Sequence, residues 1–374
     1  DVIPVLVKFS QDINKTGSVK LAVNASASYR YLLHEDEITG SGTDTIVFYY
    51  TVLEGDSANP LNFSGPSLII DQDTVLTDTE GGPVAVILPS NEQDGGLGSQ
   101  GIIIDTTAPK VNYIYKEYSG SNGTYFKAGD RIILRADLSE EVIVAEGSPP
   151  FVEINYKGTG DTNKKMTFEK TDDTKKKLYF SYTIEEGDSL INGNITMPAA
   201  EWNITAAPGE ITDITGNDLH ATLPYPSSML NPWKGLYFDT DPPMFGEGAA
   251  LTAVYDEEGH KVDLSWEKPT DVGSGLDRVF LMREEVNPQS EPVEVRNLSA
   301  TSSETSYSDQ TISKGKTYIY SVYGTDKAKN LGQILYSAEV VVPRGQDEID
   351  EEPPYWAGDA ELAVERRSSV SARL

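Results

Sequence analysis

The chain has 374 residues, no cysteine and a formal net charge of −29, with 30 Lys and Arg against 59 Asp and Glu. This acidity argues against nucleic acid as a partner, because phosphate backbones are repelled, and the lack of thiols excludes disulfides and thiolate metal sites. No apolar run reaches the roughly 18 residues that a membrane span needs, whereas 20 Tyr residues favour β-sheet.

The first strong strand signal is repeated later in the chain. Residues 46–53 alternate large apolar side chains with others and end at Gly55-Asp56, and residues 178–188 have the same pattern 132 positions later. Further anchors follow in the same order, at offsets of 135, 135 and 134: residues 77–78 with 212–213, 88–89 with 223–224, and 105–109 with 239–243. We therefore predict one module duplicated, with short loop insertions.

The second copy has an opening that the first copy lacks. It starts with a predicted strand at 111–115, and a second strand at 131–138 follows Gly129-Asp130. In the first copy, Phe9-Ser10 already corresponds to Leu138-Ser139, so we expect it to lack the opening of its module, about thirty residues. The predicted modules are residues 1–105, without its first strand or strands, and residues 106–241.

A different module is predicted at residues 242–345, with strands at 251–254, 261–266, 278–283 and 318–325. Pro243, Phe245 and Leu251 recur as Pro354, Trp356 and Leu362, at an offset of 111. Residues 346–374 are therefore predicted to be an acidic linker and the start of a further module, with a disordered tail as the alternative. No long window has helical periodicity, so the predicted fold is all-β: tandem β-sandwiches in an elongated array.

The first two modules resemble the bacterial Ig-like repeats of large surface proteins and adhesins. The resemblance rests on four segments: Gly40-Ser41-Gly42-Thr43, Glu54-Gly55-Asp56, residues 212–217, and the joint at residues 102–109. The first copy departs from the second in having Gly81-Gly82 in place of Gly216-Asn217. The resemblance implies a β-sandwich that spaces out other domains or binds through its loops.

The third module resembles a fibronectin type III module. The resemblance rests on Leu264-Ser265-Trp266, Ser274-Gly275-Leu276, residues 315–322 and residues 325–330. It implies that Trp266 lies in the core and that Tyr318 is the corner tyrosine of the fold. A fold of this kind does not by itself name a function.

The sequence contains no recognisable set of catalytic residues. The three histidines, His34, His220 and His260, lie in three different predicted modules, which argues against a zinc site or a Ser-His-Asp triad. No Gly-Lys-Ser/Thr phosphate loop occurs. We therefore predict that the chain is not an enzyme.

Acidic residues gather at the predicted module joints. In a fibronectin-type sandwich the B–C and F–G loops lie at the pole of the N-terminus, which would bring together Asp239, Asp241, Asp271, Asp326 and Asn330. The matching set at the earlier joint is Asp105, Glu140 and Asp213. Ca²⁺ takes about six to eight oxygen ligands, several of them carboxylates, so each set predicts a Ca²⁺ site. Alternatively, these residues only form turns, because Asp and Asn side chains bond to their own backbone.

The sequence favours a non-catalytic structural or interaction segment of a larger extracellular bacterial protein: a stalk, an adhesin shaft, or a surface-layer or filament component. Its expected partners are other modules of the same chain, a surface polymer or glycan, or neighbouring copies, one of which would donate a strand that completes the first module. The alternative is a set of carbohydrate- or protein-binding accessory modules of a secreted enzyme. Exposed aromatics such as Trp233 or Tyr355-Trp356 would favour that alternative.

Overall fold

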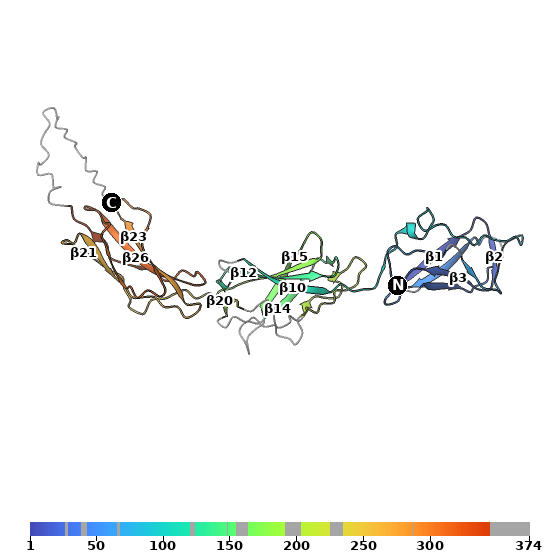
Figure 1. Cartoon of the computed structure of the whole chain (residues 1–374), viewed down its shortest axis with the longest axis horizontal. Helices are drawn as coiled ribbons and strands as arrows, with labels where there is room; N and C mark the ends of the chain where they lie inside the picture. Colours follow the sequence, from blue (N-terminus) through green and yellow to red (C-terminus); the bar gives the residue numbers. More distant parts are fainter. Residues whose placement is uncertain are drawn as a thin grey trace, which may run out of the picture. The chain divides into compact units, whose positions relative to one another are not determined.

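The structure is a computed structural model that describes residues 1–26, 29–38, 43–65, 68–119, 124–147, 149–154, 164–190, 203–224, 235–286 and 288–344 (Figure 1). The predicted linker and fourth module, at 346–374, and Trp233 lie outside these residues. The chain divides into two compact units, one of residues 1–123, 129–184 and 192–236, the other of residues 124–128, 185–191 and 237–374.

The predicted all-β class is confirmed. The described residues form strands, with a single 3₁₀ turn at Gly98–Gln100. Within these residues there is no helix of the length and apolar character that crossing a membrane requires.

In the first unit, the N-terminal copy of the repeat is built from short antiparallel pairings. These are β1 (Val2–Lys8) with β5 (Thr45–Thr51), β3 (Val19–Val23) between β4 (Arg30–His34) and β7 (Ile69–Ile70), β2 (Ile13–Thr16) with β8 (Val75–Asp78), and β6 (Ser57–Ala58) with β9 (Ile104–Asp105). The strands alternate buried and exposed residues, as expected when one face of a sheet meets a core. Their buried faces share a core that includes Val5, Leu21, Ile46 and Phe48.

The second copy in this unit has a broader sheet. Its order is β10 (Val111–Ser119), β12 (Arg131–Leu138), β16 (Lys177–Thr183), β15 (Lys164–Thr171), β14 (Phe151–Ile154) and β18 (Ile204–Thr205), and β13 (Ile143–Val144) pairs separately with β19 (Ile211–Thr212). The inward side chains of β12 and β16, among them Ile132, Leu134 and Phe180, are fully buried.

The two copies share backbone hydrogen bonds at the offsets that the sequence indicates. The Phe9 N–H donates to the Asp44 carbonyl at 2.7 Å, and the Leu138 N–H donates to the Lys176 carbonyl at 2.8 Å. The Asp78 N–H donates to the Gly82 carbonyl at 2.9 Å, and the Asp213 N–H donates to the Asn217 carbonyl at 3.0 Å. β1 is therefore the counterpart of β12, and β5 that of β16.

The second unit contains three sheets. The first has the order β11 (Tyr125–Phe126), β20 (Tyr237–Asp239) and β17 (Ser189–Leu190), and the second has the order β21 (Thr252–Asp256), β22 (Lys261–Ser265) and β25 (Ser306–Asp309). The third has the order β24 (Val293–Ser299), β23 (Leu276–Glu285), β26 (Thr317–Asp326) and β27 (Leu335–Tyr336), and β28 (Val340–Val341) also pairs with β26. The second and third of these sheets enclose a core around Tyr320 and Val322.

Both residues that the resemblance placed in this core are buried. Trp266 is 5% exposed and belongs to the core of the sandwich. Tyr318 is 4% exposed, and its hydroxyl accepts a hydrogen bond from the backbone N–H of Ser313 at 3.0 Å. This upstream backbone contact is the one expected of a corner tyrosine.

Candidate metal centres

Three carboxylates from distant parts of the sequence meet in the second unit. Asp239 ends β20, Asp271 lies in the loop after β22, and Asp326 ends β26. Each can offer an oxygen such that the three oxygens lie within 4.8 Å of one another. We call this set the Asp239 trio.

Asn330 holds the Asp326 carboxylate in place and also bonds the backbone of Asp239. Asp326 accepts hydrogen bonds from the backbone N–H and the side-chain amide of Asn330, at 2.9 and 2.7 Å. The same amide donates to the backbone carbonyl of Asp239 at 2.7 Å. Asn330 therefore ties the end of β26 to the end of β20.

The loop after β22 supplies the third carboxylate and wraps around Asp239. The Ser274 N–H donates to Oδ2 of Asp239, and the Gly275 N–H donates to Oδ2 of Asp271, each at 2.5 Å. A Cβ on Gly273 would lie 2.3–2.4 Å from the Asp239 carboxylate, so the close approach requires glycine at this position. Oδ1 of Asp271 is buried and has no hydrogen-bond partner among the described residues. A buried carboxylate oxygen in this state is costly unless a cation or a proton satisfies it.

Burial and mutual repulsion disfavour the charged states of Asp271 and Asp326. Asp326 is fully buried, and Asp239 is 3% exposed. Desolvation, with a smaller contribution from the charges of Asp239 and Asp271, raises the pKa of Asp326 to about 6 despite its bonds to Asn330. Desolvation and the charge of Asp239 also raise the pKa of Asp271. A bound cation would offset both costs.

A second trio in the first unit has the same construction. Asp105 ends β9, Glu140 follows β12, Asp213 follows β19, and an oxygen from each lies within the same 4.8 Å limit. Asp213 accepts hydrogen bonds from the backbone N–H and side-chain amide of Asn217, at 2.9 and 2.8 Å, and that amide donates to the Asp105 carbonyl at 3.0 Å. We call this set the Asp105 trio.

In the Asp105 trio, the pKa values of Glu140 and Asp213 shift in opposite directions. Desolvation and the charges of Asp105 and Asp213 raise the pKa of Glu140. The pKa of Asp213 is instead lowered: burial raises it, but the hydrogen bonds from Asn217 and Thr215 outweigh that effect. Glu140 thus protonates more readily than Asp213.

The structure brings together six of the seven carboxylates predicted to bind metal. Asp241 is the exception: it belongs to neither trio, and its backbone N–H instead donates to Asp239 Oδ1 at 3.1 Å. The sequence placed Asn330 in the right loop but gave no role to the side-chain amides of Asn330 and Asn217. The spacing Asp-x₃-Asn, shared by residues 213–217 and 326–330, was the available signal.

The first copy of the repeat keeps part of this loop. Asp78 corresponds to Asp213, and its carboxylate accepts the N–H groups of Glu80 and Gly82 at 2.9 and 2.7 Å. Gly82, however, stands at the position of Asn217, and Asp78 joins no group of three carboxylates among the described residues. The Asx-turn alone therefore does not gather a trio.

The described residues fold as tandem β-sandwich modules. No protein-family model and no curated protein matches the sequence. Among solved structures, it is similar to domains A168–A170 of titin, with a TM-score of 0.34 and 11% identity over 92% of this chain and 100% of that one. It is also similar to the FN1–FN3 domains of chicken CNTN1 (0.31, 9%, covering 91% and 98%) and to the fibronectin(III)-like modules of Clostridium thermocellum CbhA (0.29, 10%, covering 65% and 100%).

The pKa of Asp326 predicts how cation binding at the Asp239 trio depends on pH. A proton on Asp326 competes with the cation, so affinity for Ca²⁺ should be full well above pH 6 and fall as the pH drops through that value. Calorimetric titration with Ca²⁺ at pH 7.5 and pH 5 should show at least a tenfold weaker affinity at the lower pH. Equal affinities at the two values would exclude Asp326 as a ligand.

Proposed function

We propose that this chain is a non-catalytic structural segment of an extracellular protein, such as a stalk, an adhesin shaft or a surface-layer component, in which each trio binds Ca²⁺. The observation that carries the proposal is the Asp239 trio, where two buried carboxylates meet a third whose buried Oδ1 has no hydrogen-bond partner among the residues that the structure describes. Carboxylate oxygens are the ligands that Ca²⁺ prefers.

The construction of the trios supports a structural role for the ion. In both trios the carboxylates come from segments that are distant in sequence: Asp105 and Asp239 each end a strand, and the other members lie at the end of another strand or in the segment that follows one. A Ca²⁺ ion there would neutralise carboxylates that repel one another and hold these segments together. An extracellular setting fits this proposal, because extracellular modules use Ca²⁺ sites of roughly millimolar dissociation constant.

Small-angle scattering of the whole chain, in millimolar Ca²⁺ and then in chelator, tests this function. Cations that hold the modules should give a well-defined maximum dimension in Ca²⁺ and a broader distribution of shapes after chelation. The matched control is the double variant Glu140→Gln with Asp271→Asn, which should show the chelated behaviour in both solutions. Identical scattering curves with and without Ca²⁺ would remove the ion from the proposal.

One observation favours the alternative of glycan- or protein-binding accessory modules. Tyr31 on β4 and Tyr49 on β5 are 60% and 66% exposed, and aromatic side chains of this kind provide contact area for ligands. This proposal predicts that Tyr31→Ala and Tyr49→Ala abolish binding to polysaccharide without changing stability.

A further inference from the structure

A locally basic stretch interrupts the acidity of the chain in the second copy of the repeat. Residues 164–177, which comprise β15, the turn after it and the start of β16, carry six Lys against three Asp and Glu, whereas the whole chain has a net charge of −29. Two of these acidic residues already have basic partners: Glu169 contacts Arg131 at 2.7 Å, and Asp172 contacts Lys177 at 3.6 Å. A negatively charged partner can therefore approach this stretch, although the chain as a whole repels it.

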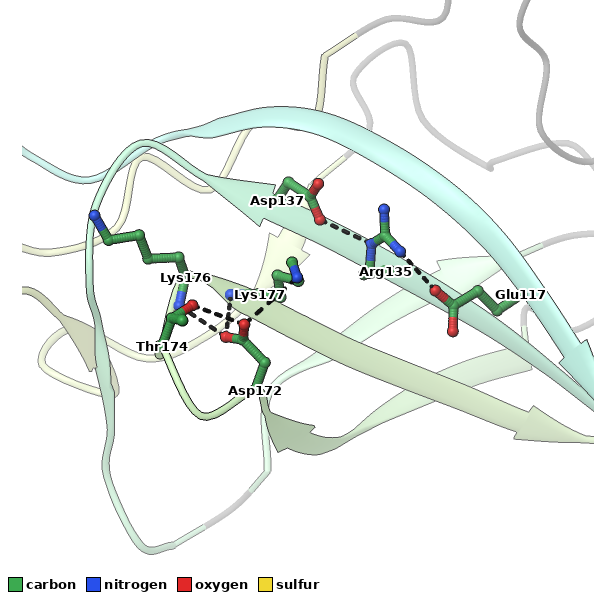
Figure 2. Close-up of polar contacts among 7 residues, drawn as sticks. All are labelled: Glu117, Arg135, Asp137, Asp172, Thr174, Lys176 and Lys177. Atoms are coloured by element: carbon green, nitrogen blue, oxygen red, sulfur yellow. Dashed lines mark hydrogen bonds and ion pairs between the residues drawn. The ribbon is translucent and has the colours of Figure 1, made fainter.

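The turn between β15 and β16 holds its lysines in a fixed backbone geometry. The Asp172 carboxylate accepts the hydroxyl of Thr174 at 2.7 Å and the backbone N–H of Lys176 at 3.0 Å, and the Lys176 side chain points away from it (Figure 2). Lys175 has a φ of 54°, a left-handed conformation that glycine adopts at lower cost. The turn geometry does not favour lysine here, so a role for its charge outside the turn accounts for the residue better than the turn does.

Beside this turn lies a groove of about 410 Å³. Its lining is partly apolar and partly cationic: residues 142–144 and Phe168, and Lys170, Thr171 and Lys175. Ile143 is 49% exposed, and both lysines are exposed. The Val142 N–H donates to the Lys175 carbonyl at 3.0 Å and so fixes the turn against the apolar side. A groove with this lining suits an aliphatic side chain that is flanked by carboxylates.

One segment of this chain has that chemistry. Residues 347–352, which lie outside the described residues, have the sequence Asp-Glu-Ile-Asp-Glu-Glu. Five of the six are acidic, a density that no other six-residue window of the sequence reaches, and Ile349 has acidic residues on both sides. Its charge and its single aliphatic side chain complement the groove.

The position at which this segment leaves the second unit argues that a neighbouring molecule supplies it. Arg344 lies beside Gly315, just before the start of β26, because a Cβ on Gly315 would be 3.0 Å from Arg344 Cγ. Asp326, at the other end of β26, lies beside Asp239, where the chain enters from the second copy. The 10 residues of β26 span about 30 Å, but the chain from Arg344 to Ile349 reaches at most about 18 Å. The segment therefore falls short of the end at which its own second copy is attached.

We propose that the groove binds residues 347–352 of a neighbouring copy of this chain. Ile349 lies on the apolar lining, and the acidic residues on either side of it face Lys170 and Lys175. Because the groove and the segment are different surfaces, the contact is heterologous and joins chains head to tail in an open series. The inference is independent of the cation sites, since no member of either trio lines the groove.

Sedimentation velocity of the whole chain at increasing concentration tests this assembly. The average mass should rise without levelling at a dimer, and high salt should reverse the rise because it screens exposed charges. Ile349→Asp and Lys170→Glu should each weaken the association about tenfold. Lys165→Glu makes the same change on the same strand outside the groove, and as the matched control it should leave the association unchanged. A chain that stays monomeric up to millimolar concentration would overturn the proposal.

Mixing two defective variants shows which surfaces meet. The double variant Lys170→Glu with Lys175→Gly loses the charges of the groove but keeps the segment, and glycine suits the left-handed position in the turn. Ile349→Asp keeps the groove but loses the segment. Where the unsubstituted chain associates, each variant alone should be monomeric, whereas the mixture should form a heterodimer and no larger species. The proposal is wrong if the mixture stays monomeric, or if Ile349→Asp alone associates as the unsubstituted chain does.

Discussion

Replacing Asp271 with asparagine should stabilise the Ca²⁺-free protein and, at the same time, abolish its stabilisation by Ca²⁺. Oδ1 of Asp271 is buried and has no hydrogen-bond partner in the part of the chain that the structure describes, and the carboxylates of Asp239 and Asp326 lie close to that of Asp271. An asparagine can keep the bond from the Gly275 N–H and present its amide to those carboxylates. We expect a gain of about 1 kcal/mol in the free energy of unfolding, the scale of one net hydrogen bond.

With Ca²⁺ bound, Asp271→Asn should lower the free energy of unfolding relative to the unsubstituted chain, because the variant lacks a charged ligand. In the unsubstituted chain, Ca²⁺ at about 100 times its dissociation constant should add about 2.7 kcal/mol to the free energy of unfolding. Hydrogen exchange of the β22 and β26 amides, in Ca²⁺ and in chelator, measures this locally. Asp241→Asn, which changes an acidic residue outside the trio, is the control and should keep the Ca²⁺ response. If Asp271→Asn were less stable than the unsubstituted chain in chelator, Asp271 would only stabilise its own loop and would not be a cation ligand.

Proximity of the carboxylates could be predicted from sequence because sandwich topology fixes which loops share a pole. Once Trp266 and the strand pattern indicated a fibronectin-like module, the loop carrying Asp271 and the turn carrying Asp326 had to lie near the entering strand. Asp241 lies outside the trio, which the sequence could not show because residue spacing does not determine which way a side chain turns. Its neighbour Asp239 is buried, whereas Asp241 lies in the exposed part of the linker.

Repeat offsets predicted the paired strands β5 and β16, but not the features that depend on three-dimensional packing. Lys15, which sequence alone would place on the surface, is fully buried, and its Nζ donates to the Gly17 carbonyl at 2.5 Å. β14, β15 and β24 each carry one or more charged residues and give weak strand signals in isolation. They become strands because neighbouring strands satisfy their backbones.

A further feature hidden from the sequence is a buried Asp–Tyr–Arg cluster in each of two different modules. In the second unit, Asp309 at the end of β25 accepts hydrogen bonds from Tyr320 and Arg283, at 2.9 and 2.7 Å. In the first unit, Asp56 accepts from Tyr50 and Arg30, at 2.7 and 2.6 Å. Asp56 follows its tyrosine by six residues, whereas Asp309 precedes its tyrosine by eleven. No shared spacing could have revealed the cluster.

The Asp309 cluster links the two sheets of the sandwich, so its loss should have a large effect. Asp309 is fully buried on β25, and its two charged or polar partners come from β23 and β26 of the other sheet. Asp309→Ala would leave the Tyr320 hydroxyl without this acceptor and would remove the carboxylate partner of the Arg283 guanidinium, which keeps only its bond to Thr311. Breaking a buried ion pair from one side costs about 3–5 kcal/mol, so we expect that loss in the free energy of unfolding of the second unit.

The pH dependence of stability gives an independent check on this cluster. Burial raises the pKa of Asp309, but hydrogen bonds from Thr311 and Tyr320 and the charge of Arg283 outweigh it, so the folded-state pKa is lowered. Its contribution is therefore fully present above the unfolded-state pKa of about 3.9 and is lost as the pH falls through the folded value. Urea unfolding between pH 7 and pH 2 should show this acid-induced loss in the unsubstituted chain and a flatter profile in Asp309→Ala.

A surface ion pair on the same sheet is the control that shows whether burial or charge alone causes the loss of stability in Asp309→Ala. Asp263 on β22 contacts Lys261 at 3.1 Å, with side chains 47% and 28% exposed, and Asp263→Ala should cost less than about 1 kcal/mol. If Asp309→Ala and Asp263→Ala lowered the free energy of unfolding equally, the buried cluster would not join the sheets. A large difference between them would place the resistance of this module to unfolding at the contact between its two sheets.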